Sequence, residues 1–262
     1  MTYEESSPRN LCVSEGPQVL RRTQWLHKYL SGRRVVRCDS TRSDIPADAL
    51  TGRLIERAFC KGKHIFIEFD GGQFLHNHLL MRGIWRKLEG QQLFLPDATW
   101  LALYVGPHTI CNIKGQMLRL VNREAVDAQC DSLGPDAMTQ PYPKDEIRQS
   151  LAATKLPVSE ALLAQSILAG VGNIAKSEAL FLAGLDPRLS ACELLPAQMD
   201  GLLDAIYTVL WNSYNKGGRW TCRICRRHGQ RCDQCGTVIR SLSLPPSKRA
   251  TYFCPKCQPQ SA

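Results

Sequence analysis

The chain has 262 residues, 44% of them hydrophobic, and carries a net charge of +9. This length and apolar fraction favour a substantial core divided between two domains rather than one. No apolar run approaches transmembrane length and no secretory segment is recognised, which argues against a membrane protein or a disulfide-stabilised secreted protein.

The first thirteen residues are polar and lack periodicity, so we interpret 1–13 as a disordered arm. Helical spacing follows Gly16-Pro17 and predicts an amphipathic helix that ends near Ser31-Gly32, with a buried face at Val19, Leu26 and Leu30.

From there to about residue 122 the pattern changes to short runs rich in β-branched and aromatic residues, separated by turn signals such as Asp70-Gly71-Gly72 and Gly106-Pro107. This pattern is typical of an antiparallel sandwich or barrel. The predicted strands lie at Val35-Val36, 64–69, 74–79, 83–88, 100–105 and 109–113.

Residues 131–157 are rich in proline and polar residues and are interpreted as an interdomain linker. Beyond it the period is helical. Residues 158–184 indicate two helices broken at Gly170-Val171-Gly172-Asn173, and a later helix has one apolar stripe formed by Met199, Leu202, Leu203, Ile206, Val209 and Leu210.

Two Cys-x-x-Cys pairs occur near the C-terminus, separated by eighteen residues. Such pairs can place four thiolates around one zinc ion, because each pair closes a tight turn and the intervening hairpin brings the pairs together. We therefore predict one structural zinc ion in preference to two disulfides. Its ligands would be Cys232, Cys235, Cys254 and Cys257. Cys222 and Cys225 are interpreted as structural, with a redox or second-metal role as the alternative.

The charge is concentrated around this motif. Residues 216–262 contain ten Lys or Arg residues and one acidic residue, a net charge of +9, so the remainder of the chain is neutral. A zinc-stabilised hairpin that carries such a cluster suits a phosphate backbone. Acidic proteins or anionic membranes would accept the same charge, but the arginine-rich cluster has no amphipathic apolar face, which favours nucleic acid.

The glycines of the 170–174 segment are explained by a tight turn between helices. A second interpretation is functional: Asn173 would begin a helix, whose free N–H groups and dipole favour a phosphate. Taken by itself, the motif does not decide between the two.

Taken together, four motifs give the chain a resemblance to the formamidopyrimidine-DNA glycosylase and endonuclease VIII (Fpg/Nei) family, on the endonuclease VIII side. They are Ser14-Glu-Gly-Pro17, Gly62-Lys63, 168–178 and the zinc hairpin with Lys248-Arg249. The resemblance covers residues 14–258. It implies an α+β multidomain protein: an N-terminal antiparallel β-sandwich with a leading helix, a helix–two-turn–helix domain and a zinc-finger β-hairpin.

The resemblance also implies a chemistry. Members of this family flip a damaged base out of DNA and attack the sugar C1′ with the amine of their first residue. The position of that residue is Ser14, and the adjacent Glu15 would transfer a proton to the sugar ring oxygen. Lys63 matches a strand lysine that contacts DNA phosphates next to the lesion, so the resemblance implies both a catalytic and a DNA-binding role for it.

Three further residues match DNA contacts of the family. Asn173 and Arg249 match residues that hold the backbone on either side of the lesion, and Met81 matches the side chain that fills the space left by the flipped base. Plainer interpretations remain for Lys63 and for two of these residues: a solvated strand-end lysine for Lys63, core filling for Met81 and one more surface cation for Arg249.

The chain departs from the family pattern at the nucleophile. Ser14 stands where proline is usual, and it is internal in the chain as written, so its nitrogen is an amide. Translation from a GUG codon at Val13, followed by removal of methionine, would expose the Ser14 amine. Gln18 replaces the usual glutamate, the loop near Leu120 to Ala125 lacks the arginine and phenylalanine of one branch, and the segment after Lys216 is short.

We therefore predict a DNA repair glycosylase with abasic-site lyase activity that acts on damaged or abasic DNA as a monomer. It would be cytoplasmic and nucleoid-associated in a bacterium and nuclear in a eukaryote. The alternatives are a catalytically silent relative that binds damaged or abasic DNA and a zinc-ribbon protein that binds RNA or ribosomes. The predicted units are an arm (1–13), a catalytic sandwich (14–130), a linker (131–157), a helical domain (158–218) and a zinc-finger hairpin (219–258).

Overall fold

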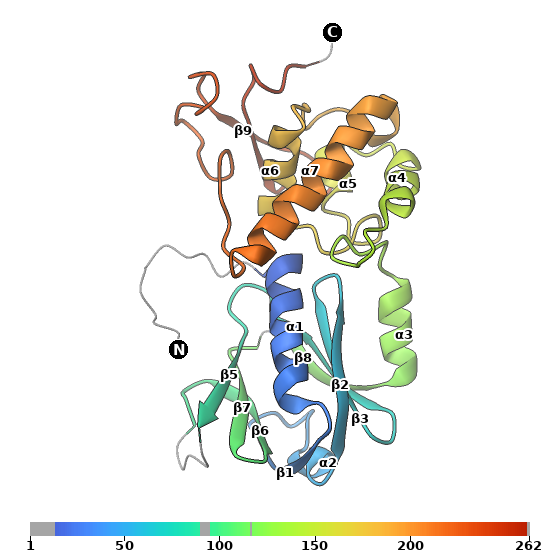
Figure 1. Cartoon of the computed structure of the whole chain (residues 1–262), viewed down its shortest axis with the longest axis vertical. Coiled ribbons are helices and arrows are strands. Elements are labelled where there is room, and N and C mark those ends of the chain that lie inside the picture. The colour runs from blue at the N-terminus through green and yellow to red at the C-terminus, as the bar shows by residue number, and fades with distance from the viewer. Residues whose placement is uncertain (1–13, 90–94, 116, 261–262) are drawn as a thin grey trace.

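The computed structural model of the chain describes residues 14–89, 95–115 and 117–260. The predicted arm and Val13 lie outside the described residues. Figure 1 shows a β-rich part below, a helical part above it, and a loop-rich C-terminal part beside the helices. The long helix α1 (Gly16–Leu30) lies along the β-rich part, and its upper end reaches α7 (Pro196–Asn215) of the helical part.

The N-terminal part is an antiparallel β-sandwich, as predicted. Strand β1 pairs with β2 through its first residues and with β6 through the rest, so it belongs to both sheets, and the full strand order is β5-β7-β6-β1-β2-β3-β4-β8. The strands are β1 (Arg33–Ser40), β2 (Leu54–Lys61), β3 (His64–Phe69), β4 (Gln73–His78), β5 (Ile84–Glu89), β6 (Thr99–Val105), β7 (His108–Ile113) and β8 (Met117–Asn122).

Helix α1 covers this sandwich and begins as the sequence predicts, with Pro17 in its first turn and its end at Leu30 before Ser31-Gly32. Val19, Leu26 and Leu30 are fully buried in the same apolar cluster as the strands. The remaining helices of this part are the short α2 (Ala47–Leu50) and α3 (Arg123–Asp131). The Asn122 side chain caps α3 by accepting from the Ala125 N–H at 3.1 Å.

The helical part contains α4 (Lys144–Ala152), α5 (Val158–Ala161), α6 (Asn173–Leu182), α7 (Pro196–Asn215) and a 3₁₀ turn (Ala191–Glu193). The apolar stripe predicted for 199–210 lies on α7, and all its members except the partly buried Val209 are buried. Helix α4 lies inside the segment expected to be a linker. Its Ile147 and Leu151 are fully buried in the helical core, so this stretch is part of the domain.

The C-terminal part is a zinc-finger hairpin, formed by β9 (Arg240–Ser243) and β10 (Ala250–Phe253). A small apolar cluster ties it to α6, because Phe181 packs with Ile224, Ile239 and the buried cysteines. Among the helices of the described residues, none is long and apolar enough to span a bilayer.

Candidate functional site

Three glycines from separate motifs meet where the sandwich contacts the helical domain. A Cβ atom added to Gly170 would lie 3.8 Å from the Gly16 Cα and 4.0 Å from the Gly62 Cα. The Gly16 N–H donates to the Gly170 carbonyl at 2.8 Å. Gly62 and Gly170 also have positive φ angles of 59° and 93°, a region that favours glycine. The glycines therefore allow two domains to approach closely, and they bring Glu15 and Lys63 to one place.

Glu15 is 1% exposed at this junction. Its carboxylate accepts hydrogen bonds from the N–H groups of Gly172 at 3.2 Å, Ile174 at 2.9 Å and Ala175 at 3.1 Å. These groups form the N-terminus of α6, where the helix dipole also favours a negative charge. Burial raises the pKa of Glu15, while the Lys63 charge and these hydrogen bonds oppose the shift. A buried carboxyl group with a raised pKa is suited to proton transfer.

This arrangement corrects one expectation from the sequence. The N-terminus of α6 was expected to offer free N–H groups to a phosphate, but the Glu15 carboxylate takes the N–H groups of Gly172, Ile174 and Ala175. Helix α6 does begin at Asn173, as expected. The helix terminus therefore positions an acidic side chain of the other domain.

Lys63 lies in the turn between β2 and β3, directly after Gly62. Asp136 holds this turn by accepting from the Gly62 N–H at 2.7 Å. Burial lowers the pKa of Lys63 to about 8; Glu15 opposes this shift, and the positive charge of Arg249 adds to it. Lys63 is thus within electrostatic reach of both the buried carboxylate and the finger arginine.

Ser14 is half-buried and directly precedes Glu15, the N-cap residue of α1. The turn of α1 that follows it is fixed by Gln18, whose Oε1 accepts from the Glu15 N–H at 3.1 Å. The Gln18 amide also donates to the Gly218 carbonyl at 2.5 Å and to the Ser213 hydroxyl at 3.3 Å. A glutamate here would face both the Gly218 carbonyl and the Ser213 oxygen. The glutamine found in this chain therefore suits the local hydrogen bonding.

Asn173 and Arg249 lie at the contact between α6 and the finger. The Asn173 amide donates to the Ala250 carbonyl at 3.0 Å, and its Oδ1 has no partner among the described residues. Arg249 is exposed in the turn that precedes β10. Its backbone N–H donates to the Ser247 hydroxyl at 3.1 Å.

Met81 lies in the turn that follows β4 and is 65% exposed, which is unusual for a large apolar side chain. The core-filling interpretation of Met81 is therefore wrong. The neighbouring Leu80 is 41% exposed and adopts a positive φ of 49°. Its N–H donates to His78 Nδ1 at 3.0 Å, which fixes the turn that presents Met81.

The four predicted metal ligands gather in the finger. All their sulfur atoms lie within 4.8 Å of one another; the Cys232 and Cys257 sulfurs are 3.9 Å apart and those of Cys235 and Cys254 3.4 Å apart. A tetrahedral zinc site with Zn–S bonds of about 2.3 Å places its sulfurs roughly 3.8 Å apart. The cluster therefore fits one structural zinc ion. Cys222 and Cys225 are not members of the metal-ligand groups found among the described residues.

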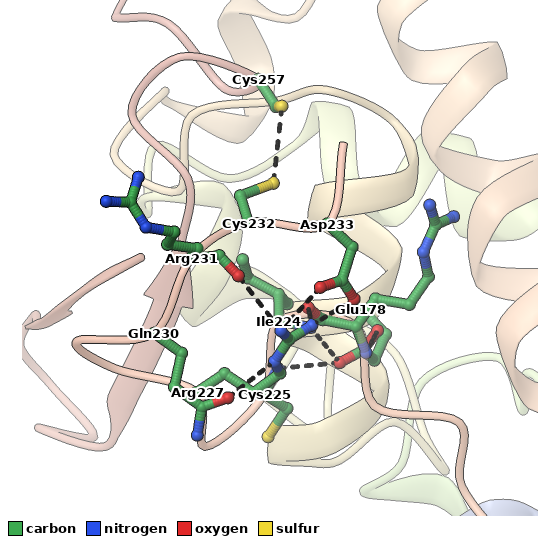
Figure 2. A network of polar contacts seen from close by, with 10 residues as sticks. Glu178, Ile224, Cys225, Arg227, Gln230, Arg231, Cys232, Asp233 and Cys257 are labelled. Carbon is green, nitrogen blue, oxygen red and sulfur yellow. Dashed lines mark hydrogen bonds and ion pairs between the residues drawn. The ribbon is translucent and has the colours of Figure 1, made fainter. Parts of the chain in front are cut away.

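Glu178 fixes the approach to this finger (Figure 2). Its buried carboxylate accepts from the backbone N–H groups of Arg223 at 2.9 Å, Ile224 at 3.1 Å and Cys225 at 2.8 Å. Nearby, Arg227 forms an ion pair at 2.5 Å with Asp233, which lies between the ligands Cys232 and Cys235. The helical domain thus holds the finger at a defined place relative to Glu15.

Sequence reasoning missed three charged groups near the site, of which one is half-buried and two are buried. Asp136 anchors the Gly62 turn, while Lys176 and Glu160 contact the finger from α6 and α5. Lys176 and Glu160 are 0% and 2% exposed. The available signal was weak, because a charged residue in a helical pattern normally indicates a solvated face.

Comparison with known proteins agrees with this architecture. Three family models match in order: the formamidopyrimidine-DNA glycosylase N-terminal domain at residues 13–122, the formamidopyrimidine-DNA glycosylase H2TH domain at 133–223, and the zinc finger found in FPG and IleRS at 229–260. Together they span most of the chain.

Similar proteins include Endonuclease 8 2 of Mycobacterium bovis, 28% identical over 262 residues, and Endonuclease 8 of Klebsiella pneumoniae, 27% identical over 264 residues. Each match covers 94% of this chain and 100% of the relative. The fold is also similar to that of Lactococcus lactis Fpg, solved with DNA that contains an abasic site. That comparison has a TM-score of 0.81 at 22% identity and covers 94% of this chain and 100% of the other. With its three domains matched in order, the chain belongs to the formamidopyrimidine-DNA glycosylase and endonuclease VIII family.

Proposed function

We propose that this protein is a DNA repair glycosylase with abasic-site lyase activity, which removes oxidised bases and cuts the strand. The observation that carries the proposal is the environment of Glu15. A buried carboxyl group with a raised pKa lies beside Ser14, at the domain junction, within electrostatic reach of Lys63. Relatives named Endonuclease 8 and the solved Fpg complexes with damaged DNA support the same class of substrate.

The proposed reaction uses the amine of Ser14. The amine attacks the sugar C1′, the bond from C1′ to the base breaks, and the displaced base leaves with a proton. Glu15 protonates the ring oxygen, which opens the sugar and gives a Schiff base between C1′ and the amine. Loss of a C2′ proton then breaks the C3′–O bond, and a second elimination at C5′ would follow in a β,δ mechanism. An α-amine suits this role because its pKa of about 7.7–8.0 leaves roughly a tenth unprotonated at neutral pH.

The remaining predicted site residues would bind DNA. Lys63, Asn173 and Arg249 would contact phosphates around the lesion, and Met81 would enter the stack where the base has left. The high exposure of Met81 and Arg249 supports these roles, because both side chains are open to a ligand. We further propose that the protein acts as a monomer, with a sandwich, a helical domain and a zinc finger as its units.

The test is borohydride trapping on a duplex with one abasic site, with the full chain and a protein that begins at Ser14 compared side by side. We expect a covalent adduct, mapped by mass spectrometry to the Ser14 nitrogen, in the shorter protein. An adduct at another residue would overturn the assignment of Ser14 as the nucleophile.

A second function is favoured by one observation: Ser14 follows Val13 in the chain as written, so its nitrogen is an amide without nucleophilic character. In that form the protein would bind damaged DNA without cutting it. Tight binding of abasic duplex with no adduct from either protein would support this alternative. Equal affinity for RNA and abasic duplex would instead support an RNA-binding zinc ribbon.

A further inference from the structure

Lys176 is a buried cation in an unfavourable position. It is 0% exposed and lies in the first turn of α6, where the positive end of the helix dipole opposes its charge. Burial is the main cause that lowers its pKa, to about 8. A lysine in such a place destabilises the fold unless specific partners offset the loss of solvation.

The partners of Lys176 connect it to the finger. Its ammonium group donates to the Thr251 hydroxyl at 2.6 Å, and Thr251 is itself fully buried in β10. Glu160, from α5, supplies the opposite charge and accepts from the Ser247 N–H at 2.8 Å and the Ser247 hydroxyl at 3.0 Å. Two buried charges of the helical domain therefore hold the two ends of one short finger segment, 247–251.

Arg249 lies in the middle of that segment. On one side its N–H donates to the Ser247 hydroxyl at 3.1 Å, and on the other the Asn173 amide donates to the Ala250 carbonyl at 3.0 Å. Lys248, between Ser247 and Arg249, has a positive φ of 54°. The backbone around Arg249 is therefore held on both sides, while its side chain stays exposed.

We propose that Lys176 and Glu160 are positioning residues that hold segment 247–251 so that Arg249 meets a DNA phosphate. The inference rests on the proposed DNA-binding function. Its physical basis is preorganisation: an arginine on a fixed backbone loses less conformational entropy when it binds than one on a mobile loop. Neither buried side chain needs to touch DNA for this role.

The test measures the affinity for an abasic-site duplex by fluorescence anisotropy across a range of salt concentrations. The single variants are Thr251→Val, Lys176→Met and Arg249→Ala, and the first two are each also combined with Arg249→Ala. The matched control is Lys155→Met, at an exposed position. Loss of one phosphate contact reduces the slope of log K against log salt by about 0.9. We expect Thr251→Val and Lys176→Met to reduce the slope by this amount although Arg249 is present, and Lys155→Met to leave it unchanged.

The double variants decide the question. If Lys176 acts through Arg249, Thr251→Val combined with Arg249→Ala binds no more weakly than Arg249→Ala alone. Additive losses, or an unchanged slope in Thr251→Val with a normal zinc content, would overturn the inference. Should Lys176→Met fail to fold, Thr251→Val and Glu160→Gln answer the same question. An Arg249→Ala protein that binds like the wild type would refute the proposed clamp itself, and the inference with it.

Discussion

Glu15 lies so close to Gly172 that no side chain fits between them. A Cβ atom added to Gly172 would lie 2.5 Å from the Glu15 Cγ and 2.5 Å from its Oε1. A glycine is therefore required at position 172 for more than turn geometry, because the missing side chain makes room for an acidic side chain from the other domain. The Gly172 N–H also donates to the same carboxylate at 3.2 Å.

Gly172→Ala should displace Glu15 and weaken the contact between the two domains. We expect a loss of about 1–3 kcal/mol in the free energy of unfolding, the usual range for a steric conflict in a core, together with loss of strand cleavage. Gly201→Ala is the matched control, because an added Cβ meets nothing within 4 Å there. It lies inside α7 and should be stabilising by about 0.5–1 kcal/mol. Thermal unfolding of both variants tests the pair; equal melting temperatures would contradict the argument.

Glu15→Gln should separate chemistry from binding. The amide keeps the shape of the carboxylate but cannot protonate the sugar, so we expect single-turnover cleavage of an abasic duplex by the Ser14-start protein to fall by about 10²- to 10⁴-fold. Affinity for the same duplex should stay within a few fold. Glu146→Gln, on the exposed surface of α4, serves as the control. Normal cleavage by Glu15→Gln would exclude proton transfer by this residue.

The affinity for DNA should depend on pH through Lys63. Because the pKa of Lys63 is lowered to about 8, this side chain is mostly charged at pH 7 and mostly neutral at pH 9. A phosphate favours the charged form, so the affinity for duplex DNA should fall as the pH rises across this range. Lys63→Arg, which stays charged, should flatten the profile in anisotropy measurements at constant ionic strength. A wild-type affinity that does not change between pH 7 and 9 would argue against a phosphate contact at Lys63.

Removal of zinc should unfold the finger and leave the rest of the fold in place. The apolar cluster of the finger is small, so the metal must supply much of its stability. We expect Cys254→Ser to bind no zinc and to lose at least about tenfold in affinity for DNA, since the +9 charge of residues 216–262 would no longer be held in one place. Cys222→Ser is the control and should keep one zinc ion per chain by native mass spectrometry. Retention of zinc by Cys254→Ser would contradict the four-cysteine assignment.

Local patterns predicted much of the fold. The strand at 64–69 was predictable because it is a short run rich in β-branched and aromatic residues. The stripe on α7 was predictable because burial of one helix face imposes a short-range period. Strand β2 was not predicted, because Arg57 and Lys61 interrupt its apolar pattern. In the structure, Arg57 pairs with Glu68 of the neighbouring strand at 2.6 Å, and the Lys61 ammonium donates to the Cys130 carbonyl at 2.7 Å. Both partners lie outside β2, 11 and 69 residues away in the chain, so the pattern of the strand itself does not reveal them.

The candidate site, like the fold, could be predicted from the sequence only in part. The zinc ligands follow from spacing, because the two Cys-x-x-Cys pairs lie on either side of one hairpin. The contact of the Glu15 carboxylate with the N-terminus of α6 and the burial of Lys176 both depend on how whole domains dock. Lys176 has the sequence context of an ordinary helical lysine. Only the docked finger, whose Thr251 lies 75 residues later in the chain, makes it a buried residue with a hydrogen-bond partner.

The three donors of the Glu15 carboxylate lie 157, 159 and 160 residues after it in the chain. During synthesis the sandwich leaves the ribosome well before α6 exists, so this carboxylate remains hydrated until the second domain has folded and docked. The environment that raises its pKa belongs to the assembled molecule and to neither domain alone. A proteolytic cut between the domains, followed by their separation, would therefore abolish this environment without altering any residue of the site.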